Sequence, residues 1–159
     1  MPEFVNGLPL HALVVHAVVV LIPLAVLGAI LIAVWPAARR RFGWLVVVAA
    51  GVGAALTPIA TESGENLERR LPQNPLIETH QELGDRLIWF VLPLFVVVLA
   101  LMLVHTAAAR STATWTNSAL IVLAVLTIGA GVASGIHVYR VGDAGSRAVW
   151  DGTENLPAR

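Results

Sequence analysis

Four stretches of this chain carry no charged residue, and each is about as long as a helix that crosses a membrane. A helix needs about 20 mostly apolar residues to cross a hydrocarbon layer of ~30 Å. We therefore predict an all-α fold, an integral membrane four-helix antiparallel transmembrane bundle. The uncharged stretches are Leu10 to Val34, Trp44 to Thr61, Leu87 to Ala109 and Ser111 to Val138.

Composition supports this class and excludes several others. The chain is 57% hydrophobic and 13% charged, whereas soluble domains carry about 25% charged residues. It has no cysteine, which excludes disulfides and iron–sulfur clusters. Its balanced charge argues against nucleic acid as a partner. We predict one transmembrane domain, 1–159, with spans at about 10–35, 43–61, 75–109 (including a start outside the membrane) and 113–139.

Arginines set the predicted orientation. Arg39, Arg40 and Arg41 follow the first span, and Arg110 marks the other short turn on the same side. Short basic loops are typically cytoplasmic. We therefore expect a multi-pass protein of the plasma (inner) membrane with both termini extracytoplasmic.

Four of the five histidines fall on the predicted outer side. Intramembrane imidazoles are costly and usually functional. Histidine is also a common ligand of haem, zinc, copper and iron. The shared depth of these side chains therefore predicts a site, without naming a reaction. They are His11, His16, His80 and His137.

His11 and His16 are five residues apart, so they project about 140° apart around one helix. This separation argues against both side chains binding one small ion. His16 lies deeper in an apolar run, and we expect it to face the bundle interior. We predict His16 and His80 as the first axial ligands of a haem b, with His11 and His137 as alternates.

The start of the third span is expected to be helical outside the membrane. Asn74 and Pro75 are typical of an N-cap and a first helical residue. An apolar stripe at helical spacing follows and includes His80. His80 should therefore be buried, while Glu78 and Glu82 stay in water.

Other side chains on the outer side extend the candidate site. Glu62 and Glu65 are neighbours on one helical face. With His11, His16 and His80 they form a candidate site for a divalent metal ion. Arg86 and Arg140 are candidates for pairing with haem propionates, although ordinary ion pairs are an alternative.

His105 is expected to stand apart from this site. It lies 25 residues after His80, about 37 Å along a straight helix at 1.5 Å per residue. The two side chains therefore cannot share one cofactor.

Several segments resemble a bacterial membrane family known as domain of unknown function twenty-two thirty-one, most closely its actinobacterial members. The resemblance implies a four-helix membrane protein and no specific activity. Many relatives carry a late histidine where this chain has Val141. The segments that carry it are Gly7 to His16, Ala60 to Glu65, His80 to Arg86, Val138 to Gly142 and Gly145 to Trp150.

These observations favour a small membrane protein that binds haem b or a metal at its outer side, with a redox or electron-transfer role. The first alternative is a non-haem metal-binding sensor or transport protein. The second is a cofactor-free structural or accessory subunit. The expected partners are the lipid bilayer and either a membrane redox partner or a second copy of the chain. Whether the protein is an enzyme is left open.

Overall fold

The computed structural model describes residues 4–108 and 115–152, except the side chain of Trp115. Nearly all of this part is helical, with a short β-hairpin at its start. Within it, four helical spans are long and apolar enough to cross a membrane, and α3 and α4 together make one of them. The elements are β1 (Phe4–Val5), β2 (Leu8–Pro9), α1 (Leu10–Val34), α2 (Pro36–Glu68), α3 (Pro75–Arg86), α4 (Ile88–Ala108) and α5 (Trp115–Trp150).

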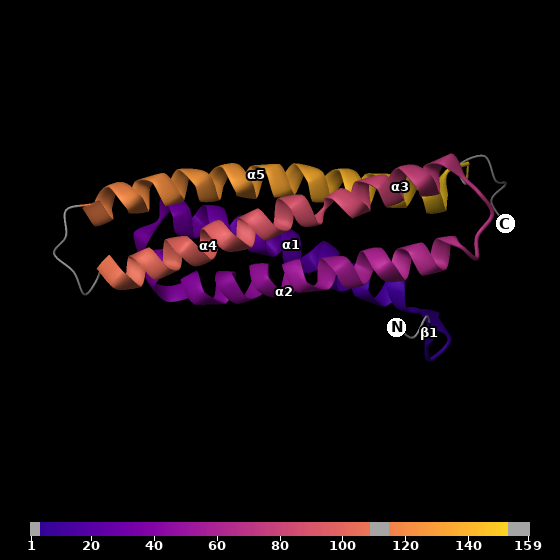
Figure 1. Ribbon diagram of the computed structural model, residues 1–159, viewed down its shortest axis with the longest axis horizontal. Helices are drawn as coiled ribbons and strands as arrows, with labels where there is room; N and C mark the ends of the chain where they lie inside the picture. The colour runs from indigo at the N-terminus through magenta and orange to yellow at the C-terminus, as the bar shows by residue number, and fades with distance from the viewer. Residues whose placement is uncertain (1–3, 109–114, 153–159) are drawn as a thin grey trace, which may run out of the picture.

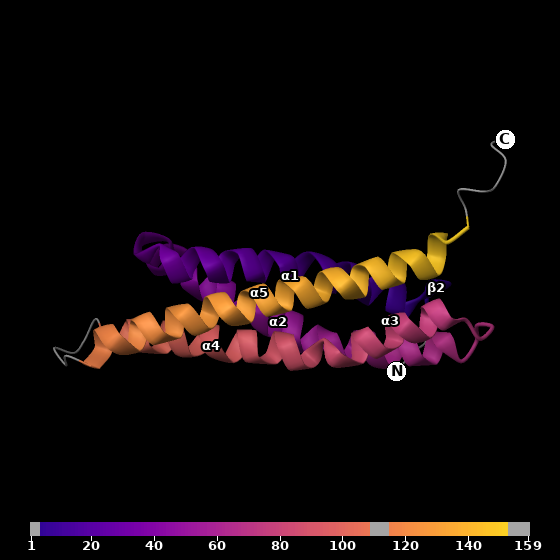
Figure 2. The same ribbon diagram turned by 90° about the horizontal axis from the view of Figure 1, so that it is seen from above.

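The spans form an elongated antiparallel bundle, as predicted (Figure 1). Neighbouring pairs are α1 with α2, α2 with α4, α4 with α5, and α5 with α1. Seen from above, α5 runs diagonally over the bundle between α1 and α4 (Figure 2). The start of α1, the end of α2, α3 and the end of α5 all lie at one end, which we call the histidine end.

A tight turn joins α1 to α2 at the opposite end. Trp35 has an extended backbone, and Pro36 begins α2 directly after it. Arg39 folds back and donates from Nε to the Ile32 carbonyl at 2.8 Å and from Nη2 to the Ala33 carbonyl at 2.7 Å. The guanidinium therefore occupies carbonyls that the end of α1 leaves without helical partners.

The helices continue beyond the predicted apolar spans. α2 runs to Glu68, and α5 runs to Trp150. At 1.5 Å per residue, the 36 residues of α5 measure about 54 Å, well beyond the ~30 Å hydrocarbon layer. α3 packs against the C-terminal part of α5. The histidine end is therefore a helical layer that extends past the membrane-spanning part.

α3 and α4 are almost one helix, close to the prediction. A single residue separates them, Leu87, whose φ of −59° and ψ of −37° are themselves helical. Asn74 caps α3 as expected, because its side chain accepts a hydrogen bond from the Leu76 amide at 2.9 Å.

The bundle interior is filled mainly by aliphatic side chains from α1, α2 and α4. Gly43 allows close packing, because a Cβ there would lie 2.2 Å from the sulfur of Met102. The largest fully buried apolar side chains are Ile22, Ile32, Val91, Leu94, Val98, Leu101 and Met102.

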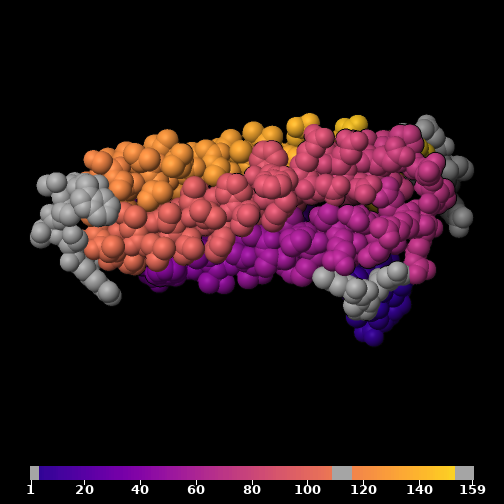
Figure 3. All heavy atoms as spheres, in the orientation of Figure 1, coloured from indigo at the N-terminus to yellow at the C-terminus, as the bar shows by residue number. Residues whose placement is uncertain are grey.

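The N-terminal hairpin is a feature that the sequence analysis did not predict. It projects from the side of the bundle at the histidine end (Figure 3). Asn6 and Gly7 form its turn with φ values of 51° and 80°. An Asn-Gly pair is the usual signal for such a two-residue turn, since both residues adopt positive φ readily. The Asn6-Gly7 pair is therefore a sequence signal from which this hairpin turn could have been predicted.

Candidate functional site

His11 links the first turn of α1 to α2. Its Nδ1 donates to the carbonyl of Ala60 at 2.9 Å. The ring lies against Gly64, where an added Cβ would be 3.0 Å from both Cε1 and Nδ1 of the imidazole. The absence of a side chain at Gly64 therefore lets α2 approach the ring closely.

His80 makes an equivalent link from α3 to α5. Its Nδ1 donates to the carbonyl of Val141 at 3.0 Å. A Cβ at Gly145 would lie 2.9 Å from Cε1 of this ring. His80 is half-buried, while Glu78 and Glu82 are exposed. The two carboxylates are thus wet as predicted, and His80 is less deeply buried than expected.

His137 completes a reciprocal pair of links between α3 and α5. Its Nε2 donates to the carbonyl of Leu83 at 2.8 Å, while His80 on α3 donates to α5. The His137 ring stacks on Phe90, with centroids 4.1 Å apart and an interplanar angle of 13°. It is only 5% exposed. His137 therefore fixes how α5 sits against α3 and the start of α4.

The structure places His11 and His80 next to each other. Their ring centroids are 6.2 Å apart and the ring planes are 76° from parallel. One ring comes from α1 and the other from α3, so two segments far apart in sequence bring them together. Each ring is held through Nδ1, which leaves its Nε2 lone pair available in the neutral form.

The expectation that His16 faces the interior is wrong. His16 is exposed, and its Nδ1 hydrogen-bonds to the Ala12 carbonyl of its own helix. The reason is helical rotation. Val18 and Ile22 are buried and project within about 20° of His11, so the rotation that turns His11 inward turns His16 outward. The pair in contact is therefore His11 with His80.

The five side chains of the predicted metal site do not gather at one point. Glu62 is exposed and Glu65 is half-buried. Both line a hollow of about 320 Å³ that also includes Asp85. Within residues 4–108 and 115–152, no group of three or more histidine or carboxylate side chains is arranged to hold a metal ion.

The remaining candidates lie around the histidine network or far from it. Arg86 and Arg140 are both exposed. His105 lies at the opposite end, in the electrostatic neighbourhood of Arg39 and Arg40. Arg110 lies outside the described residues. His105 is therefore remote from the imidazole pair, as its position in the sequence predicted.

Sequence reasoning missed the residues that receive and support the imidazoles. The carbonyls of Ala60, Leu83 and Val141 could not be singled out, because every residue carries one. Gly64 and Gly145 carried a weak signal, since a glycine within a helix allows close approach by a neighbouring group. That signal did not indicate what approaches.

Comparisons with known proteins agree with this architecture. None of the curated proteins and none of the solved structures matches the chain. A family model described as "Predicted membrane protein (DUF2231)" matches residues 7–154. This range includes both histidines of the pair and the helices that carry them. The chain therefore belongs to the DUF2231 family of membrane proteins.

Proposed function

We propose that the histidine end binds haem b, which the imidazoles of His11 and His80 would hold, and that the protein carries electrons at the outer face of the plasma membrane. One observation carries the proposal. Two imidazoles from different helices lie with ring centroids 6.2 Å apart, and each is anchored through Nδ1 to a backbone carbonyl. His11, one of the alternates in the sequence analysis, therefore replaces His16 as the proposed partner of His80.

The hydrogen bonds fix which nitrogen of each ring can act as a ligand. A carbonyl oxygen only accepts, so Nδ1 of His11 and Nδ1 of His80 must carry the protons. In the neutral rings Nε2 is then the unprotonated nitrogen. Metal-bound histidines typically donate their other N–H to a carbonyl or carboxylate, which orients the ring and raises its basicity. Both side chains thus have the tautomer that ligation requires.

The number of available donors favours haem over a small divalent ion. Structural and catalytic zinc sites take three or four protein ligands, and no such group exists within the described residues. A haem iron needs protein ligands only at its axial positions. Two imidazoles therefore suit haem better than zinc. When bound, haem would supply one-electron exchange at its iron.

The chain's own groups would hold and orient that site. The carbonyls of Ala60 and Val141 would keep each ring from rotating. Arg86 and Arg140 remain the candidates for pairing with propionates, because both are exposed at this end. Electrons would pass to a redox partner in the membrane or to a second copy of the chain.

The test is the haem content of the purified protein and of four single variants. Wild type expressed with added haem precursor should show a Soret band. His11→Ala and His80→Ala should each lose most of it, whereas His16→Ala and His105→Ala should keep it. Circular dichroism checks that all four variants are folded. Full haem occupancy in His11→Ala would rule out the ligand assignment.

A cofactor-free structural or accessory role is the second candidate. The observation that favours it is the reciprocal link, in which His80 and His137 each donate to the other's helix. In that case purified protein shows neither a Soret band nor bound metal, and His80→Ala lowers only stability. Bound metal without a Soret band would instead support a non-haem metal-binding sensor or transporter.

A further inference from the structure

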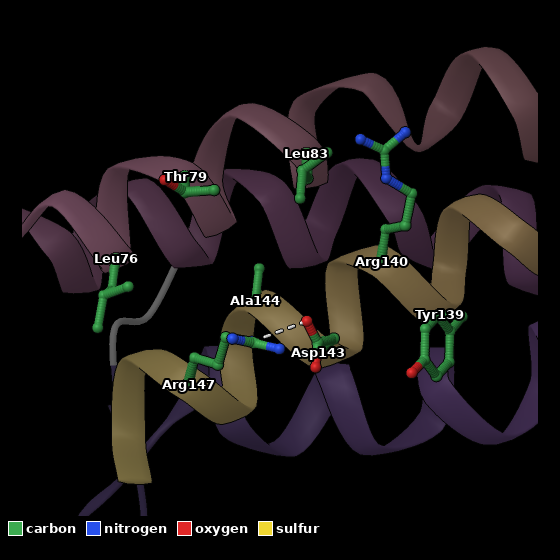
Figure 4. A pocket seen from close by; sticks show the side chains of 8 residues that line it. All are labelled: Leu76, Thr79, Leu83, Tyr139, Arg140, Asp143, Ala144 and Arg147. Atoms are coloured by element: carbon green, nitrogen blue, oxygen red, sulfur yellow. Dashed lines mark hydrogen bonds and ion pairs between the residues drawn. The ribbon is translucent and has the colours of Figure 1, made fainter. Parts of the chain in front are cut away.

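A second hollow lies on the outer flank of the contact between α3 and α5. Its volume is about 190 Å³. Leu76 and Leu83 of α3 line one side, and Tyr139, Arg140 and Arg147 of α5 line the other (Figure 4). The hollow is distinct from the imidazole pair, because Arg140 projects about 100° around α5 from Val141, the residue that His80 contacts.

The charge of this hollow comes from one arginine. Arg147 donates from Nε to Asp143 at 2.9 Å, so these two charges are matched. For Arg140, no hydrogen bond or ion pair exists with any residue in the described part of the chain. Figure 4 shows its side chain extending from α5 towards α3 beside Leu83. The hollow therefore presents a guanidinium that is available to an anion.

The depth of Arg140 matches the phosphate layer of a membrane. The stretch from Ser111 to Val138 carries no charge, and Arg140 is the first charged residue after it. Tyr139, 73% exposed, has the aromatic ring typical of a membrane interface. Arg140 thus lies where the hydrocarbon layer gives way to head groups.

An apolar strip continues from the hollow towards the membrane interior. Ile136 precedes Arg140 by four residues and projects about 40° from it around α5, and Val132, eight residues before Arg140, projects about 80° from it. They are 58% and 47% exposed. Acyl chains could lie along this strip while a phosphate contacts the guanidinium. A free inorganic anion would make no contact with this apolar strip.

We propose that the hollow between α3 and α5 binds an anionic phospholipid, with Arg140 contacting its phosphate. Guanidinium groups pair with phosphate through short charge-assisted hydrogen bonds, and basic pockets between membrane helices bind anionic head groups. Thr79 and Tyr139 also line this hollow. The proposal does not depend on the haem assignment.

The test is native mass spectrometry of the haem-free protein with phosphatidylglycerol, phosphatidylcholine or inorganic phosphate. Wild type should retain one phosphatidylglycerol with roughly fivefold preference over phosphatidylcholine, because the choline ammonium neutralises the phosphate of phosphatidylcholine and weakens its attraction to a single basic residue. Arg140→Gln should lose most of this preference, and Arg140→Lys should keep part of it. Arg69→Gln is the matched control, since Arg69 is an exposed arginine at the same end.

Three results would overturn the proposal. The first is equal retention of both lipids by wild type. The second is equal loss of preference in Arg140→Gln and Arg69→Gln. The third is displacement of the lipid by millimolar inorganic phosphate, which would identify a soluble-anion site. Haem content of Arg140→Gln is measured separately, and a fall in haem with unchanged lipid retention would assign Arg140 to the propionates instead.

Discussion

At the histidine end, imidazoles of α1, α3 and α5 donate to carbonyls of neighbouring helices, whereas at the opposite end Arg39 donates to carbonyls of the helix that directly precedes it. The first arrangement joins segments that are 49, 61 and 54 residues apart, and the second joins residues 6 and 7 apart. The opposite end is thus fixed by a local turn, and the histidine end by long-range contacts. Only the long-range arrangement brings ligand-type side chains from different helices together.

Labelling of introduced cysteines tests which of these two ends is outside, and its expected effect is all-or-none. Gln73 is exposed beyond α2, and Arg41 is exposed at the opposite end. In this cysteine-free chain, Gln73→Cys should react with an impermeant maleimide on intact cells. Arg41→Cys should react only after permeabilisation, because its basic turn is expected inside. The opposite pattern would place the histidine end in the cytoplasm.

The largest loss of stability should come from the local arrangement. Arg39→Ala removes the guanidinium of a residue that is 6% exposed and leaves two carbonyls without their partner. Charge-assisted hydrogen bonds contribute about 1.5–3 kcal/mol each, so we expect a loss of about 3 kcal/mol. The measurement is unfolding in mixed micelles. Arg40→Ala, which changes an exposed arginine of the same turn, should cost less than about 0.5 kcal/mol.

A comparable loss in Arg40→Ala would contradict this account of the opposite end. Stability would then depend on the overall charge of the turn rather than on the two bonds of Arg39. Arg39→Lys offers a further check, since it keeps the charge but loses the planar fork of donors.

At the histidine end, two glycines of α5 make a matched pair. A Cβ at Gly145 would lie 2.9 Å from His80, whereas a Cβ at Gly142 would have nothing within 4 Å. Gly145→Ala must displace the imidazole, and overpacking costs about 1–3 kcal/mol. Gly142→Ala should be neutral or stabilising by up to about 1 kcal/mol, because alanine favours helix. The same unfolding assay compares them.

The haem content of the same two variants sharpens the comparison. If His80 is a ligand, Gly145→Ala should lower haem content and Gly142→Ala should not. Equal stability and equal haem content in both variants would show that the ring at His80 moves freely, and the site would not be preorganised.

The helices were predictable because the membrane imposes a strong constraint on sequence. A chain that crosses hydrocarbon must be apolar and satisfy its own backbone hydrogen bonds, so the uncharged stretches located every span. Their ends were not predictable in the same way. α2 and α5 continue to Glu68 and Trp150, because outside the hydrocarbon layer polar residues can stay helical when neighbouring helices pack on them. The length of each uncharged stretch therefore corresponds to the thickness of the hydrocarbon layer and not to the full length of the helix.

The site was predictable in part, for a related reason. Helical geometry showed that His11 and His16 face different directions. Choosing His16 as the interior-facing side chain was wrong, because its depth in the apolar run was given more weight than the position of the buried face. Val18, Ile22 and Ala25 mark that face, and His11 lies on it. The cross-helix carbonyl partners had no sequence signal, since they depend on the register between helices.

The smallest expected effect tests whether a hydroxyl acts like the imidazoles. Ser134 is fully buried and donates from α5 to the Phe90 carbonyl of α4 at 2.9 Å. Hydrogen bonds between membrane helices contribute about 0.6 kcal/mol on average, because unpaired groups find other partners in the bilayer. Ser134→Ala should therefore cost about 0.6 kcal/mol, and Ser118→Ala, at an exposed position of the same helix, should cost nothing measurable. If the two variants lose the same stability, the Ser134 hydrogen bond does not help to join α4 to α5, and the hydrogen bonds that hold α5 are those that His80 and His137 make between α3 and α5.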